Sequence, residues 1–152
     1  MYFYNVIKDL AKKNDIMLYV DMDGVIAAYD VGNPSDFLNK RPLMNNIKQI
    51  EDISKIENVE VYILSICRKD FQIDEKNQWL DKYAPFFKKE NRNIISKETV
   101  SGYTSAEIKT NFLKEVKTNK QVILIDDDNM VLKDVRQNVE GIIVFQDSQL
   151  VD

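Results

Sequence analysis

An apolar run that ends in two carboxylates constrains this chain more than any other stretch. Residues 18–20 are Leu-Tyr-Val, and Asp21-Met22-Asp23-Gly24 follows directly. Such a run, bounded by acids and a glycine, predicts a buried β-strand, and the side-chain period of two points Asp21 and Asp23 to the same side. Gly24 lets the backbone turn sharply there. The two carboxylates then need either a hard cation between them or pKa values that are pushed apart.

A second strand with the same kind of ending lies late in the chain. Residues 121–125 are Gln-Val-Ile-Leu-Ile, and Asp126, Asp127, Asp128 and Asn129 follow. One Asp-x-Asp-Gly sequence is also typical of a polar loop that merely opens after a strand. Two acid-tipped strands together predict a cation site between them.

Composition limits the size and class of the protein. With 152 residues and 44% hydrophobic content, we expect one domain over residues 1–152, without a linker. The net charge of −4 gives no general attraction to nucleic acid, so a polyanionic partner would need a local basic patch. The net charge does not exclude a small anionic substrate. No apolar segment has the length of a membrane span and no signal peptide is recognisable, so we expect a cytoplasmic protein with no membrane partner.

The cysteine and histidine counts exclude several kinds of chemistry. The single cysteine, Cys67, excludes an internal disulfide and a Cys-rich zinc site. The chain has no histidine, which removes Ser-His-Asp and Cys-His catalysis, His-ligated zinc and phosphohistidine chemistry together. Because no histidine can act as its base, we interpret Cys67 as a partly buried thiol. Carboxylates, lysines and hydroxyls are left to do any catalytic work.

Predicted strands and helices alternate along the chain. Apolar periodicity and turn residues predict helices over 3–11, 43–53, 74–83, 104–116 and from Asp128 or Asn129 towards Gly141. Strands are predicted over 16–21, 60–64, 93–96, 121–126 and 142–145. The fourth helix carries a capping-box pattern, Thr104-x-x-Glu107. This order predicts an α/β fold, a doubly wound parallel sheet of about five strands with helices on both faces.

Ligands of such sheets collect at the carboxyl ends of the strands, near the point where the strand order reverses. If the order is third, second, first, fourth, fifth, then Asp21, Ser65 and Asp126 share one site. Residues 27–42 contain the breakers Gly32, Pro34 and Pro42 and few apolar residues. We predict a loop or flap there, over the strand ends.

These residues resemble the four ordered motifs of the haloacid-dehalogenase-like (HAD) phosphohydrolases over about residues 16–145. The motifs are Asp21-Met-Asp-Gly-Val25, the strand ending in Ser65, a lysine near a helix start, and Asp126-Asp127 on a late strand. Lys76-x-x-Trp79-Leu80 and Ile123–Asp127 look most like the deoxyribonucleotidase-like branch. The resemblance implies a three-layer HAD-like Rossmannoid sheet of order 5-4-1-2-3. The sequence departs from many members in having little or no cap domain.

The resemblance also implies roles for the two acidic strand ends. Asp21 would attack phosphorus and form an aspartyl-phosphate, while Asp23 would first protonate the leaving oxygen and then activate water. Mg²⁺ would be held by the carboxylates of Asp21 and Asp126 and by the backbone carbonyl of Asp23. Asp127 would be a further ligand, directly or through a water molecule.

The phosphate-binding groups are Ser65 and a lysine. Ser65 would donate its hydroxyl to the phosphoryl group; alternatively, it only ends a strand. Four lysines precede the last acidic strand: Lys109, Lys114, Lys117 and Lys120. We select Lys109 because it lies three and four residues before Phe112 and Leu113, at the edge of the apolar stripe. Arg68 and Lys69 could reach the substrate phosphate or base, or be ordinary surface charges.

The function that this resemblance implies is a Mg²⁺-dependent phosphomonoesterase of the 5′-nucleotidase kind, acting on a small phosphorylated substrate, with a nucleoside monophosphate favoured. Sugar-phosphate phosphatase, polynucleotide-end phosphatase and phosphomutase are alternatives. A non-catalytic HAD-like domain that binds a phosphorylated ligand or a protein partner is another. Without a cap the site is open, so either the substrate is large or the flap and a second subunit of a homodimer enclose it.

Overall fold

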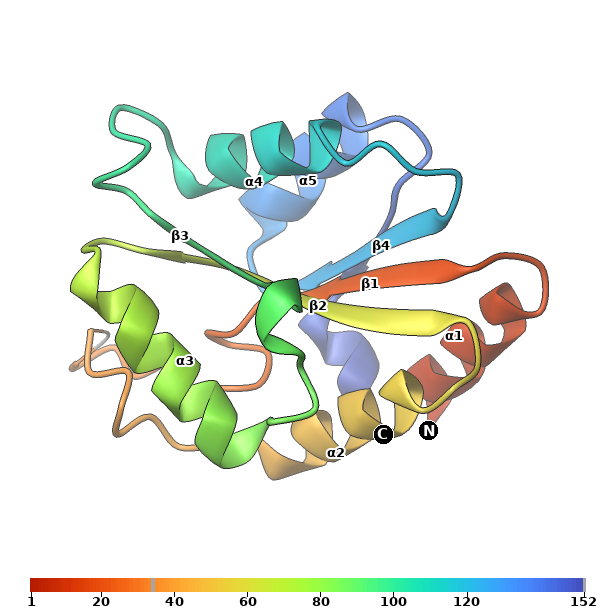
Figure 1. The fold of residues 1–152 in the computed structure, drawn as a ribbon, viewed down its shortest axis with the longest axis horizontal. Coiled ribbons are helices and arrows are strands. Elements are labelled where there is room, and N and C mark those ends of the chain that lie inside the picture. Colours follow the sequence, from red (N-terminus) through yellow and green to blue (C-terminus); the bar gives the residue numbers. More distant parts are fainter. Residues whose placement is uncertain (34, 152) are drawn as a thin grey trace.

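A five-stranded parallel sheet forms the middle layer of the molecule (Figure 1). The computed structural model describes residues 1–33 and 35–151, so the predicted breaker Pro34 lies outside the described residues. The strands are β1 (Ile16–Val20), β2 (Val59–Cys67), β3 (Arg92–Ser96), β4 (Gln121–Asp126) and β5 (Ile143–Gln146). Their order is β3-β2-β1-β4-β5, which confirms the predicted topology and places β1 between β2 and β4.

Helices cover both faces of this sheet (Figure 1). They are α1 (Tyr2–Ala11), α2 (Met44–Ser54), α3 (Phe71–Tyr83), α4 (Ser105–Lys114) and α5 (Asn129–Asn138), with short 3₁₀ turns at Lys89–Asn91 and Asp147–Leu150. The first three helices share one apolar cluster with the sheet, and α4 and α5 share another. The described residues form no further layer over the sheet.

Strand β1 shows why the sequence adopts this arrangement. Its side chains are almost all buried, and successive residues enter different cores: Leu18 and Val20 join the cluster below α1–α3, whereas Tyr19 joins the cluster below α4 and α5. A strand that is covered on both faces is apolar throughout, without alternation. The polar residue Asp21 therefore marks the point where the strand leaves the core.

Two side-chain caps fix the starts of α4 and α5, which follow the carboxyl ends of β3 and β4. The Thr104 hydroxyl accepts from the Glu107 amide and the Glu107 carboxylate accepts from the Thr104 amide, which confirms the predicted capping box of α4. Asp128 caps α5 by accepting a hydrogen bond from the Met130 amide at 2.9 Å. Each cap satisfies backbone donors that a helix start leaves free.

Several element boundaries differ from the predictions. Strand β2 continues to Cys67 because Ile66 and Cys67 pair with the neighbouring strand β3, so Ser65 lies within the strand and not at its end. Helix α3 begins three residues early, at Phe71, and α4 ends two residues early, at Lys114. Pairing and packing with other elements set these limits, and local propensity does not report them.

The loop after β1 is closed at its base. Ala27 forms isolated bridges with Asp23 and with Pro42, the Ala28 amide donates to the Arg41 carbonyl, and the Leu43 amide donates to the Ile26 carbonyl, both at 2.8 Å. The described residues between these points contain no helix or strand, as predicted. The loop therefore leaves the end of β1 and returns to it before α2 begins.

Candidate active site

Three carboxylates meet at the carboxyl ends of β1 and β4. These strands are neighbours in register, Val20 opposite Ile125, so Asp21 and Asp126 follow at adjacent positions. One carboxylate oxygen from each of Asp21, Asp126 and Asp127 lies within 4.8 Å of the others. They line a cavity of about 420 Å³. The other residues that line it are Asp23, Tyr29, Ile66, Ser105, Lys109, Asp128 and Val131.

Lys109 joins two of these carboxylates. From the first turns of α4, its ammonium donates to Asp21 Oδ1 at 2.9 Å and to Asp126 Oδ2 at 2.6 Å, and its side chain is buried. The three other lysines that precede β4, Lys114, Lys117 and Lys120, are exposed. The structure thus brings the selected lysine to the cluster.

The cluster carries more negative charge than its single lysine balances. Burial raises the pKa of Asp21 despite the opposing effect of Lys109, and burial together with Asp126 raises the pKa of Asp127 to about 6. Burial alone would lower the pKa of Lys109, but Asp21 and Asp126 outweigh it and raise that pKa. A compact set of carboxylate oxygens with excess negative charge fits a hard divalent cation such as Mg²⁺.

Gly24 makes room for one of these carboxylates. Its φ is +85°, and a Cβ at this position would lie 1.9 Å from Asp127 Oδ2. No side chain fits at that distance. The glycine therefore serves both the turn after β1 and the close approach of Asp127, a link between two distant motifs that the sequence did not reveal.

Asp23 occupies a separate part of the site. Its carboxylate accepts from the Lys40 ammonium at 2.6 Å and from the Lys76 ammonium at 3.0 Å. Burial acts to raise the pKa of Asp23, but the two ammonium groups outweigh it and hold that pKa below its ordinary value. Asp21 and Asp23 line the same cavity, as expected, but their partners differ: Asp21 belongs to the carboxylate cluster, and Asp23 to a pair of lysines.

Lys76 connects Asp23 to Ser65. Its side chain is completely buried, and its ammonium also donates to Ser65 Oγ at 2.6 Å and to the Ile66 carbonyl at 3.0 Å. Because the Ser65 oxygen accepts from Lys76, the serine proton is free to be donated to another acceptor. Ser65 is thus held in the network and does more than continue a strand.

Lys40 and Lys76 are site residues that the sequence interpretation did not assign. Both ammonium groups lie over the Phe37 ring, at 4.6 and 4.3 Å from its centroid, and the Trp79 indole donates to the Lys40 carbonyl at 3.0 Å. A signal for Lys76 was present, since it lies three and four residues before Trp79 and Leu80 on the buried side of α3. A lysine within an apolar stripe has to find buried acceptors.

Cys67 ends β2, and Arg68 and Lys69 follow it. Cys67 is buried, and burial raises the pKa of its thiol, which agrees with a thiol that is not a nucleophile. Arg68 and Lys69 are exposed, and Lys69 forms an ion pair with Glu98 at 3.2 Å. Neither basic residue lines the carboxylate cavity.

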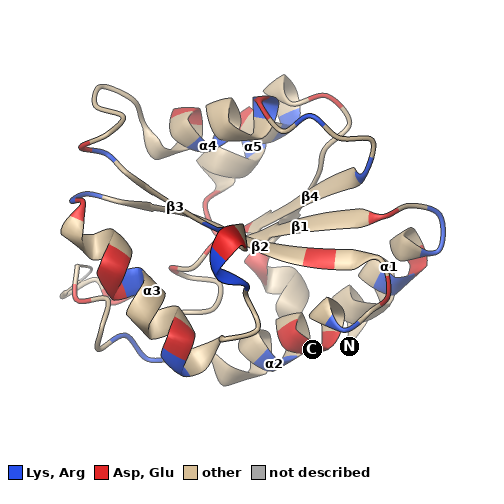
Figure 2. Cartoon of the chain, viewed as in Figure 1, with Lys and Arg blue, Asp and Glu red and all other residues tan. Residues whose placement is uncertain are grey.

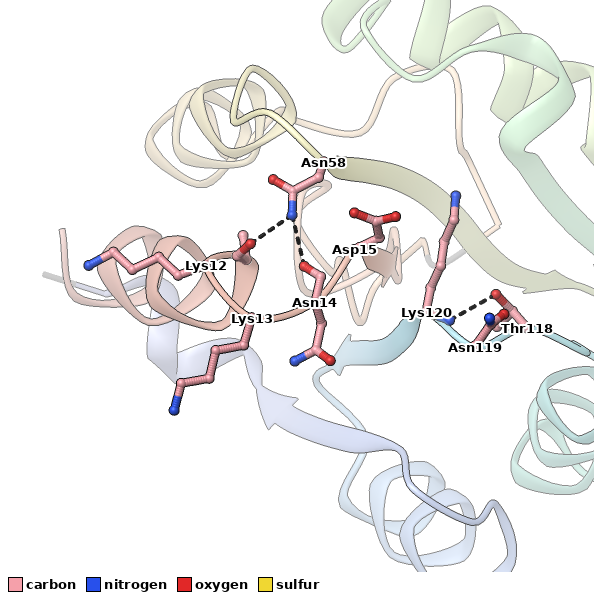
Figure 3. A pocket seen from close by; sticks show the side chains of 9 residues that line it. Lys12, Lys13, Asn14, Asp15, Asn58, Thr118, Asn119 and Lys120 are labelled. Carbon is pink, nitrogen blue, oxygen red and sulfur yellow. Dashed lines mark hydrogen bonds between the residues drawn. The ribbon is translucent and has the colours of Figure 1, made fainter.

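A larger pocket, of about 530 Å³, lies at the amino ends of the strands, opposite the carboxylate cavity (Figure 3). Its lining consists of Ala11, Lys12, Lys13, Asn14, Asp15, Asn58, Thr118, Asn119 and Lys120. There the Asn58 amide donates to the carbonyls of Ala11 and Asn14, at 2.7 and 2.8 Å, and so joins two connections. It has one carboxylate, mostly exposed side chains and no buried charge, so we assign the candidate active site to the smaller, carboxylate-lined cavity.

Comparisons with known proteins identify the fold. The sequence matches no protein-family model and no curated protein sequence. Its structure is similar to a chain in the Pnkp1/Rnl/Hen1 RNA repair complex, with a TM-score of 0.68, 19% sequence identity and 88% of this chain covered. A chain in a second structure of the Pnkp1/Rnl/Hen1 complex gives the same three values.

The present chain spans less than half of these neighbours, 42% and 46% of their lengths. At this level of identity the similarity shows a shared α/β fold. In addition, none of the described helices is long and apolar enough to span a membrane.

Proposed function

We propose that this protein is a divalent-cation-dependent phosphomonoesterase that works through an aspartyl-phosphate on Asp21. The observation that carries the proposal is the convergence of Asp21, Asp126, Asp127 and Lys109 in one cavity at the edge of the sheet. The HAD resemblance of the motifs, with Ser65 on the adjacent strand, supports the same assignment.

The chain supplies the groups that phosphoryl transfer needs. Asp21 attacks phosphorus, the bond from phosphorus to the leaving oxygen breaks, and water then attacks the phosphorus of the aspartyl-phosphate to release inorganic phosphate. Lys109 and the free Ser65 proton stabilise charge on the phosphoryl oxygens. Mg²⁺ would be held by Asp21, Asp126, Asp127 and the Asp23 carbonyl, and would neutralise phosphate charge.

Asp23 handles the protons in this proposal. As a carboxylate beside two ammonium groups, it is suited to take the proton of the attacking water. For the first step it has to carry a proton to the leaving oxygen, which its lowered pKa opposes. The negative charge of a phosphate bound in the cavity that Asp23 lines acts in the opposite direction, raises that pKa and favours the acid form.

For the substrate, we favour the terminal phosphate of a polynucleotide over a free nucleoside monophosphate. The described residues contain no cap over the cavity, so a large substrate can enter. The similarity to chains of an RNA repair complex points to the same alternative. Closure by a second subunit stays a prediction.

Hydrolysis of p-nitrophenyl phosphate tests the proposed chemistry. Activity should require Mg²⁺, disappear with EDTA and be lost in Asp21→Asn. Asp15→Asn is the matched control, because this exposed acid precedes the same strand at the opposite edge of the sheet. Activity that ignores the metal, or survives in Asp21→Asn, would contradict the proposal. Phosphorylated oligonucleotides, mononucleotides and sugar phosphates then rank the substrates.

A further inference from the structure

Exposed hydrophobic side chains lie in the connections that follow the strands, on the same side of the sheet as the candidate active site. The described part of the chain exposes ten large ones, and three of these, Met1, Tyr2 and Val151, lie at the chain ends. The other seven lie between the end of a strand and the first turn of the next helix, at the edge that carries the cavity. They are Tyr29, Val31, Leu38, Met44, Phe71, Tyr103 and Met130. Such clustering marks a contact surface.

Two of these side chains are aromatic rings at the starts of the helices that carry the site lysines. Phe71 is 64% exposed and precedes Lys76 by five residues on α3, and Tyr103 is 49% exposed and precedes Lys109 by six residues at the start of α4. At a rise of 1.5 Å per residue, the Phe71 position lies about 7.5 Å further out along the helix axis than that of Lys76. Neither ring lines the cavity, and both follow strand ends on the side of the sheet where the cavity lies.

The connections that hold these two rings are joined to each other. Glu98, after β3, accepts from the Asp70 amide at 3.0 Å and pairs with the Lys69 ammonium at 3.2 Å. The Lys97 amide donates to the Cys67 carbonyl at 2.9 Å, and Gln72 accepts from the amides of Arg68 and Lys69. These bonds fix the backbone between Phe71 and the loop that leads to Tyr103.

Positive charge without a side-chain partner lies in the same two connections as the rings, with Arg68 between β2 and Phe71 and Lys97 between β3 and Tyr103. Within residues 1–33 and 35–151, no side chain binds the Arg68 guanidinium or the Lys97 ammonium. Figure 2 shows basic residues just beyond the ends of both β2 and β3. Aromatic rings that share short connections with cations lacking partners suit bases and phosphates, whereas a protein partner would favour a continuous apolar face.

We propose that this rim, comprising Phe71, Tyr103, Arg68 and Lys97, holds the single-stranded end of a polynucleotide whose terminal phosphate is in the cavity. Bases beyond the terminal nucleotide stack on Phe71 and Tyr103, and the internal phosphates lie against Arg68 and Lys97. This inference rests on the proposed phosphomonoesterase function. It adds that the enzyme reads nucleotides beyond the one it dephosphorylates, and that paired ends are poor substrates.

The test compares kcat/KM for p-nitrophenyl phosphate, a phosphorylated mononucleotide, phosphorylated single strands of increasing length and a blunt duplex. We expect wild type to prefer single strands over the mononucleotide. Phe71→Leu and Tyr103→Leu should each reduce that preference at least fivefold, the lower end of what one stacked base contributes, and leave p-nitrophenyl phosphate hydrolysis unchanged. Phe71→Tyr and Tyr103→Phe, which keep the rings, should behave as wild type. Arg68→Gln should weaken the salt dependence of oligonucleotide hydrolysis.

The outcomes separate this inference from the function on which it rests. If wild type hydrolyses no phosphate ester, the proposed function fails. If it hydrolyses p-nitrophenyl phosphate but treats mononucleotides, single strands and duplex ends alike, the rim inference is overturned and the function stands. Leucine variants that retain the full preference for single strands would also overturn the rim inference. The exposed hydrophobic side chains would then be assigned to a protein partner. Tyr2→Leu, an exposed ring near the chain start, is the matched control.

Discussion

Lys76 gives the sharpest prediction about the stability of the site. The substitution Lys76→Met keeps an unbranched apolar stem and removes the ammonium group. That group bonds Asp23 Oδ2, Ser65 Oγ and the Ile66 carbonyl at 3.0, 2.6 and 3.0 Å. Because Lys76 is 0% exposed, water has little room to replace these bonds.

The expected loss of unfolding free energy follows from the groups that Lys76→Met leaves without their partner, Asp23 above all. Breaking a buried ion pair by removing one member costs about 3–5 kcal/mol of the free energy of unfolding. Asp23 keeps Lys40 at 2.6 Å and its side chain is 24% exposed, so the lower end of that range applies. A loss of about 3 kcal/mol lowers the Tm of a domain of this size by roughly 6–12 °C.

Urea unfolding measures this effect, with fluorescence of the single tryptophan as the probe. Trp79 is buried one turn from Lys76 on the same helix and reports local unfolding there. Lys82→Met is the matched control: it removes an exposed lysine of α3 and should change stability by less than about 0.5 kcal/mol. If Lys76→Met is as stable as Lys82→Met, the buried network around Asp23 does not exist as described.

Two further predictions concern Gly24 and Cys67. Gly24→Ala should cost about 1–2 kcal/mol of backbone strain and should also displace Asp127, which the new Cβ would meet at 1.9 Å, so the Mg²⁺ concentration for half-maximal activity should rise. Gly102→Ala is the control, because Gly102 has a φ of +87° and open space around it and should show the strain alone. An equal Mg²⁺ requirement in both variants would count against the Asp127 contact. Burial raises the pKa of the Cys67 thiol, so the thiolate fraction of Cys67 at pH 8 is below that of an ordinary cysteine. Native protein should therefore react with iodoacetamide much more slowly than protein unfolded in urea. Equal rates in the two states would show that Cys67 is accessible.

The convergence of the acids was predictable from sequence because it depends on short local patterns, combined with the strand order that the family resemblance implied. A buried strand that ends in carboxylates has one exit from the core, and parallel strands place these exits at one edge. This geometry predicts the approach of Asp21 to Asp126 that the structure has. Lys109 was predictable because helical geometry places it at the edge of an apolar stripe, facing the sheet.

Lys40 and Lys76 show where that reasoning ends. Lys40 lies in a loop without periodicity, and its position depends on how the backbone returns to Pro42 and on the bond from Trp79 to its carbonyl. Lys76 lies on the buried face of α3, where pattern reading expects apolar residues. The ion pairs of Asp23 therefore follow from tertiary packing, and the sequence separations of 17 and 53 residues carry no local signal.

Trapping the phosphorylated enzyme tests the central claim most directly. In Asp23→Asn the second step lacks its base, so mixing the variant with Mg²⁺ and p-nitrophenyl phosphate, followed by an acid quench and peptide mass spectrometry, should show one phosphoryl group on Asp21. Asp21→Asn/Asp23→Asn should show none. A phosphoryl group on another residue, or a single variant that turns over substrate without ever carrying one, would contradict the account.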